Sequence, residues 1–163
     1  MKTLLLMRHA KSSHDEEGLS DHERPLTGRG RRDAPRVAER LVEADLVPDR
    51  ILCSTARRAK ETAELFAPAA GFGGEVTYSH WLYHATPAGI LDVIAEHGGD
   101  AGRLMVVGHN PGMEQLVRSL TGDPAHMPTA AVARIELPID DWDAIRGGAT
   151  GRLAALWKPK DEE

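Results

Sequence analysis

The chain begins with a short apolar run that ends in two chemically active side chains. Residues 3–7 have the length and composition of a strand buried on both faces, and Arg8 and His9 follow it directly. Such strands belong to sheets that helices cover on both sides, and these sheets bind ligands at their carboxyl edge. An arginine beside an imidazole at that edge suggests an anion site with a nucleophile in it, although one such pair is a weak signal.

The remaining pattern alternates helices and strands. Further strands are predicted at 50–53, 75–78, 103–107, 131–137 and 152–157, and helices at 27–45, 57–66, 87–98, 113–120 and 140–145. Pro68 and the glycines at 71–74 are expected to end the second helix. This order predicts a single domain over residues 1–163, a three-layer α/β/α sandwich with a mainly parallel sheet of about six strands. Residues 10–26 are predicted to form a long loop, which in compact domains is commonly functional.

Composition excludes several classes of protein. The net charge of −5 argues against a nucleic-acid or membrane-surface partner, so a cluster of arginines must serve a small anion. Cys53 is the single cysteine, which excludes an intrachain disulfide and a cysteine-based zinc site. The sequence has no stretch of transmembrane length and no secretory signal, which predicts a cytoplasmic protein.

Two other predicted strands end like the first one. The second delivers Ser54, with Arg57 and Arg58 just beyond it, and the fourth delivers His109. In a parallel sheet these side chains meet His9 at one edge, close to helix N-termini that favour anions. One arginine can bind two phosphate oxygens at once through two N–H groups, and a neutral imidazole can attack phosphorus. The pattern predicts a phosphoryl-transfer site without metal or cofactor, and of the two arginines Arg57 is the weaker candidate.

Four segments, in order along the chain, match one known family. They are Arg8-His9-Ala10, Arg24-Pro25-Leu26-Thr27-x-x-Gly30, Ser54-x-x-x-Arg58-Ala59-x-x-Thr62 and Gly108-His109-Asn110-Pro111-Gly112. Together they resemble the histidine phosphatase superfamily, with its phosphoglycerate-mutase-like fold, and its SixA-type phosphohistidine phosphatases in particular. The resemblance implies that His9 is the nucleophile, that Arg8, Arg58 and His109 surround the phosphoryl group, and that no metal takes part.

The sequence departs from many members of that family at one point. Many members of the family have an Asp or Glu after the third strand, and its carboxylic acid protonates the leaving group. Residues 76–86 of this chain contain no Asp or Glu. An alkoxide leaving group needs that proton, but the imidazole of phosphohistidine can leave as a neutral ring. The missing carboxylate therefore favours phosphohistidine in a protein as the substrate. His84, or Asp15 and Glu16 of the long loop, remain candidate proton donors.

Two other functions remain open at this point. One is a general phosphomonoesterase that acts on a small phosphorylated substrate, and the other is a phosphate- or phosphoprotein-binding module without catalysis. Trp81 and Tyr83 are candidates for the mouth of the site, although packing explains them equally well.

Overall fold

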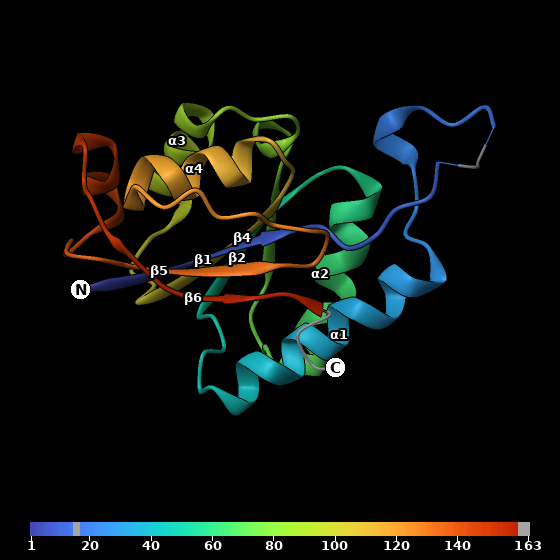
Figure 1. The fold of residues 1–163 in the computed structure, drawn as a ribbon, viewed down its shortest axis with the longest axis horizontal. Helices are drawn as coiled ribbons and strands as arrows, with labels where there is room; N and C mark the ends of the chain where they lie inside the picture. The colour runs from blue at the N-terminus through green and yellow to red at the C-terminus, as the bar shows by residue number, and fades with distance from the viewer. Residues whose placement is uncertain (15–16, 160–163) are drawn as a thin grey trace.

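The computed structural model describes residues 1–14 and 17–159, which fold around a six-stranded sheet (Figure 1). The strand order is β3-β2-β4-β1-β5-β6, with β1 to β4 parallel and β5 antiparallel to both of its neighbours. The strands are β1 (Lys2–Arg8), β2 (Arg50–Ser54), β3 (Val76–Ser79), β4 (Arg103–Gly108), β5 (Val132–Leu137) and β6 (Arg152–Trp157). The predicted mainly parallel sheet of about six strands is confirmed.

Helices cover both faces of this sheet, as Figure 1 shows. The α-helices are α1 (Gly28–Glu43), α2 (Arg57–Ala70), α3 (Pro87–His97) and α4 (Gly112–Thr121), and the 3-10 helices are η1 (Asp21–Glu23), η2 (His80–Leu82) and η3 (Trp142–Gly147). Leu4 and Leu6 pack with the helices α3 and α4, whereas Leu5 and Met7 pack with α1 and α2. The unbroken apolar run of β1 exists because successive side chains enter two separate cores.

The parallel register aligns the carboxyl ends of the central strands. Arg8 of β1 pairs with Gly108 of β4, and Cys53 of β2 pairs with Val107 of the same strand. The residues that follow these positions therefore leave the sheet side by side. Cys53 itself is fully buried, as expected for a strand residue.

The loop between β1 and α1 is tied to the start of that helix. Thr27 caps α1, since its hydroxyl accepts a hydrogen bond from Gly30 N at 3.1 Å. Gly30 lies against the loop backbone so closely that an added Cβ would stand 2.2 Å from Lys11 O. This close approach explains the glycine that follows Thr27 by three residues, and it fixes the loop beside the end of β1.

The second helix differs from its prediction. It continues through Pro68 to Ala70, and Gly71 ends it in the left-handed conformation with φ of 68°. A proline near the end of a helix removes one hydrogen bond without stopping the last turn, so the predicted end near residue 66 is wrong. Within the described residues, every helix is too short or too polar to span a bilayer.

Candidate active site

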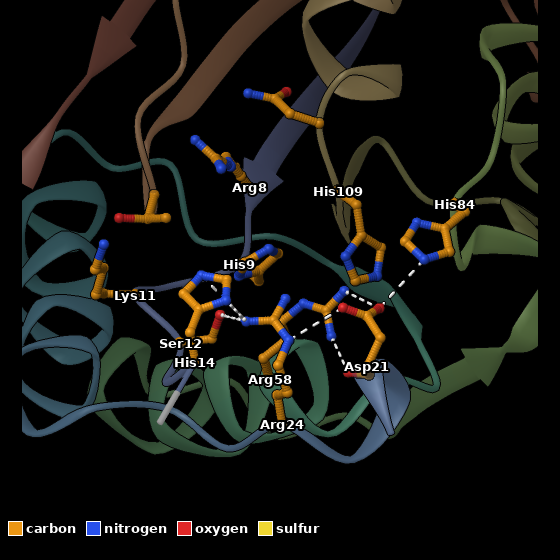
Figure 2. Close-up of a pocket in the computed structure, with 12 residues that line it drawn as sticks. Arg8, His9, Lys11, Ser12, His14, Asp21, Arg24, Arg58, His84 and His109 are labelled. Atoms are coloured by element: carbon orange, nitrogen blue, oxygen red, sulfur yellow. Dashed lines mark hydrogen bonds and ion pairs between the residues drawn. The ribbon is translucent and has the colours of Figure 1, made fainter. Parts of the chain in front are cut away.

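The predicted site residues meet in one cavity at the carboxyl edge of the sheet (Figure 2). Its volume is about 240 Å³, and it is lined by Arg8, His9, Lys11, Ser12, His14, Asp21, Arg24, Arg58, His84, His109, Asn110 and Thr129. The cavity thus joins residues that follow three strands to residues of the long loop. This convergence is what the sequence predicted for His9, Arg8, Arg58 and His109.

His9 is held as a neutral imidazole, with one nitrogen that bonds to none of the described residues. Its Nδ1 lies 2.8 Å from Ala10 O, and because a carbonyl can only accept, Nδ1 carries the proton and Nε2 keeps its lone pair. Burial, followed by the positive charges of Arg58 and Arg8, lowers the pKa of His9 to about 3. The side chain therefore has the protonation state and the free atom of a nucleophile.

His109 lies next to His9 and uses its other ring nitrogen, Nε2, for its hydrogen bond to the protein. The ring centroids are 5.1 Å apart, and His109 Nε2 lies 2.8 Å from the hydroxyl of Ser54. That hydroxyl accepts a hydrogen bond from Ala56 N and has one proton of its own to donate, which allows the tautomer of His109 in which Nε2 accepts. In that tautomer the proton of His109 resides on Nδ1, which is buried and has no partner among the described residues. The ring then offers an N–H donor beside His9.

Arg8 and Arg58 are two of the four cationic side chains that line the cavity, together with Lys11 and Arg24. Arg58 is 2% exposed, and it donates from Nη1 to Asp21 O at 2.6 Å and from Nη2 to Asp21 Oδ2 at 3.0 Å. Arg8 donates from Nη1 to Met127 O at 3.1 Å. Both side chains keep a buried Nε without a partner in the described part of the chain. They are therefore oriented by the protein and retain donors for an anion.

Asp21 is the site residue that sequence reasoning missed. Besides Arg58, its carboxylate accepts hydrogen bonds from the Tyr83 hydroxyl and from Arg24 Nε at 3.0 Å, and it lies 3.2 Å from His84 Nε2 (Figure 2). The bonds from Tyr83, Arg58 and Arg24 hold the pKa of Asp21 well below its usual range. The cavity thus contains a carboxylate, but one that is ionised.

Of the other residues that the sequence suggested for the site, some lie at the cavity and some lie away from it. His84 lines it, in a left-handed backbone conformation with φ of 53° that is strained for histidine. Tyr83 contacts His109 with a centroid distance of 5.5 Å, so it lies at the site rather than in the core. Arg57 is outside the cavity and pairs with Glu61 at 3.6 Å. Asp15 and Glu16 lie outside the described residues.

Comparisons with known proteins place this chain in a family. Residues 4–82 match the histidine phosphatase superfamily (branch 1). An uncharacterized chloroplastic protein of Arabidopsis thaliana is 31% identical over 97% of this chain and 78% of its own. The structure of the protein assigned as SixA from Nakamurella multipartitia is 28% identical with a TM-score of 0.84, over 98% of this chain and 96% of its own. The chain belongs to the histidine phosphatase superfamily.

A second SixA structure supports the same placement within the superfamily. The protein from Agrobacterium tumefaciens is 27% identical with a TM-score of 0.82, and the match covers 97% of this chain and 98% of that one. The SixA-type resemblance read from the sequence is thus confirmed, together with the phosphoglycerate-mutase-like fold. In the residues that the structure describes, no three metal-ligating side chains are grouped to hold an ion.

The neutral histidines of this histidine phosphatase site predict a dependence of stability on pH. Burial lowers the pKa of His9 to about 3 and that of His109 to about 2, whereas the unfolded chain takes up protons on both near 6.5. The unfolded state then binds more protons below pH 6.5, so the free energy of unfolding should fall as the pH drops from about 7 towards 3. Each histidine contributes a slope of up to about 1.4 kcal/mol per pH unit.

Urea unfolding of the protein and of His109→Asn between pH 7 and pH 4 measures this slope. We expect the variant to lose a large part of it, because one buried neutral imidazole is gone. An equal slope in both proteins would contradict the assignment of His109 as a histidine that is neutral in the fold.

Proposed function

We propose that the protein hydrolyses phosphohistidine in a partner protein through a phosphorylated His9. The Nε2 lone pair of His9 attacks phosphorus while the bond from phosphorus to the substrate's imidazole breaks, and that nitrogen takes the electron pair. The substrate ring leaves neutral because its other nitrogen carries a proton. Water then attacks the phosphorus of phospho-His9 and forms a new O–P bond while the Nε2–P bond breaks. The electron pair returns to Nε2, and the protons of the water end on the inorganic phosphate that is released.

The surrounding donors would bind the phosphoryl group during both steps. Arg8 and Arg58 match its oxygens with paired N–H groups, and His109 Nδ1 adds a neutral donor. In phosphoryl transfer such positioning and charge stabilisation provide most of the catalysis. The proposed roles of these three residues need no metal ion.

The ionised state of Asp21 is the observation that favours phosphohistidine over a phosphoester. A phosphoester leaves as an alkoxide, and a neighbouring carboxylate repels that growing negative charge. A phosphohistidine ring that carries a proton is positive before it leaves, and the same carboxylate attracts it. Asp21 accepts bonds from Arg58, Tyr83 and Arg24, so it stays charged across the neutral pH range. The two SixA structures carry the assigned name phosphohistidine phosphatase, which supports the same substrate.

His84 is the candidate that moves a proton in this site. Its Nε2 lies 3.2 Å from Asp21 Oδ2, so the carboxylate orients the ring. We assign to His84 the exchange of a proton with the leaving group or the attacking water. The short connection 80–86 that carries it adds no large segment over the cavity, and this suits a substrate presented on a protein surface.

Replacement of Asp21 by asparagine tests the substrate assignment. We expect the ratio of kcat/KM for phosphohistidine to kcat/KM for a sugar phosphate to fall about tenfold or more, because the carboxylate attracts one leaving group and repels the other. Any shift of Arg58 in the variant weakens both reactions together and cancels in the ratio. Steady-state release of inorganic phosphate from both substrates gives the measurement.

Two results would reject this proposal in different ways. Faster turnover of the sugar phosphate by the unaltered protein would indicate a general phosphomonoesterase. Absence of turnover and of a phosphorylated intermediate with either substrate would indicate a binding module. Glu23→Gln is the matched control, since this glutamate lies on the same 3-10 helix outside the cavity lining.

A further inference from the structure

Trp81 stands out on the surface near the active site. Its side chain is 70% exposed, which among the large hydrophobic residues of the described chain is exceeded by Met1 alone. Tryptophan is among the residues that most often dominate binding at protein interfaces. A tryptophan that the fold leaves in water is therefore a candidate contact for another molecule.

The fold holds the Trp81 side chain in an outward orientation. Trp81 lies in the middle of η2, and its neighbour Leu82 is buried in the core at 1% exposure. Successive residues of a 3-10 helix point about 120° apart, so the burial of Leu82 turns Trp81 outwards. The His80 ring lies against the indole with a centroid distance of 4.3 Å and restricts its motion.

A groove runs between the indole and one face of α3. Its volume is about 240 Å³, and its other lining residues are Gly89, Asp92, Val93 and Glu96. These positions follow the i, i+3, i+4, i+7 spacing of one helix face. Gly89 and Val93 give the groove an apolar floor, and Asp92 and Glu96 border it with two carboxylates.

The chemistry of this groove matches a guanidinium group. Arginine stacks flat on an indole and binds carboxylates through its N–H groups. The side chains of Asp92 and Glu96 are 62% and 64% exposed, so both can be reached from solvent. Arg146 lies 3.5 Å from one oxygen of Asp92, and His97 lies 3.7 Å from Glu96. Asp92 thus pairs with a guanidinium of this chain that is not among the lining residues of the groove.

The groove and the active site share one short segment of chain. Tyr83 and His84, which follow Trp81 by two and three residues, both contact the catalytic groups. Two residues of extended chain, the separation of Trp81 from Tyr83, span roughly 7 Å. The Tyr83 ring lies 5.5 Å from the His109 ring, which lies 5.1 Å from the His9 ring. A protein that places a phosphohistidine at His9 covers these steps within an ordinary interface.

We propose that the groove between Trp81 and α3 binds an arginine side chain of the phosphorylated partner protein. The inference rests on the proposed function, since it names a feature of the same substrate. The arginine lies on Trp81 while the phosphohistidine enters the cavity at His9. Recognition of the partner is thereby separated from the chemistry, because no catalytic side chain lines the groove.

Two synthetic peptides provide the test. One carries arginine on both sides of a phosphohistidine, and the other carries citrulline, which has the same shape without the charge. We expect the unaltered protein to show a kcat/KM about fivefold higher for the arginine peptide. Trp81→Ala and the double variant Asp92→Asn with Glu96→Gln should each remove this preference. Equal turnover of the two peptides by the unaltered protein would overturn the proposal.

Matched controls separate the groove from general effects of substitution. Tyr78→Ala removes another exposed aromatic ring, one that faces Lys60 of α2, and Glu39→Gln with Glu43→Gln removes two acidic residues one turn apart on α1. Both should keep the preference for arginine. Calorimetric binding of the two peptides to His9→Ala tests the groove independently of turnover. Failure of phosphohistidine hydrolysis with a preserved binding preference would reject the proposed function alone.

Discussion

Replacing His9 by alanine is expected to abolish turnover and to prevent formation of a phosphorylated protein. The side chain sits at the end of β1 with Nδ1 bound to Ala10 O, so Nε2 is the atom that can attack. Loss of a nucleophile in an enzyme with covalent catalysis costs about 10⁴-fold or more in kcat. Rapid acid-free quenching with radiolabelled substrate should show an acid-labile label on the unaltered protein and none on the variant.

The same substitution distinguishes catalysis from mere binding. A phosphate-binding module would show neither turnover nor label, with or without His9. His97→Ala is the matched control, because this partly exposed histidine lies at the end of α3 outside the cavity lining, and it should retain full activity. A labelled His9→Ala protein would place the nucleophile elsewhere and contradict the site.

The sequence predicted the central geometry because that geometry depends on topology. Once β1, β2 and β4 are parallel, His9, Arg58 and His109 must emerge together, and strands of this kind are visible as apolar runs. Three of the four segments that resemble the histidine phosphatases lie at the ends of these strands, and the fourth lies at the start of α1. The three-layer sandwich was predictable for that reason, whereas the end of α2 was not, since a proline in the last turn is tolerated locally.

Asp21 could not be predicted in the same way. It belongs to a polar loop with several acidic residues, and nothing in the sequence separates it from Asp15 or Glu17. Its place depends on the fold of that loop over the N-terminal end of α2, where Arg58 donates to both its carbonyl and its carboxylate. Tyr83 and His84 reach it from a connection far along the chain. Contacts of this kind carry no periodic signal.

Replacing Arg58 by methionine should lower kcat/KM about 10³-fold while its neighbour Arg57 tolerates the same change. Arg58 is buried at the cavity and offers paired donors, and removal of such a group in phosphoryl transfer costs about 10³- to 10⁵-fold. Arg57 is 44% exposed and pairs with Glu61, so Arg57→Met should change kcat/KM by about twofold or less. Steady-state kinetics on phosphohistidine gives both values.

Arg58→Lys shows whether charge or geometry matters at this position. Lysine keeps the positive charge but presents a single ammonium, which cannot reproduce the two bonds that Arg58 makes to Asp21. We therefore expect activity between that of the methionine variant and that of the unaltered protein, with a loss of about tenfold or more. Full activity of the lysine variant would mean that the site requires only a local positive charge. An equal loss in Arg57→Met and Arg58→Met would assign anion binding to the start of α2 as a whole rather than to the Arg58 guanidinium.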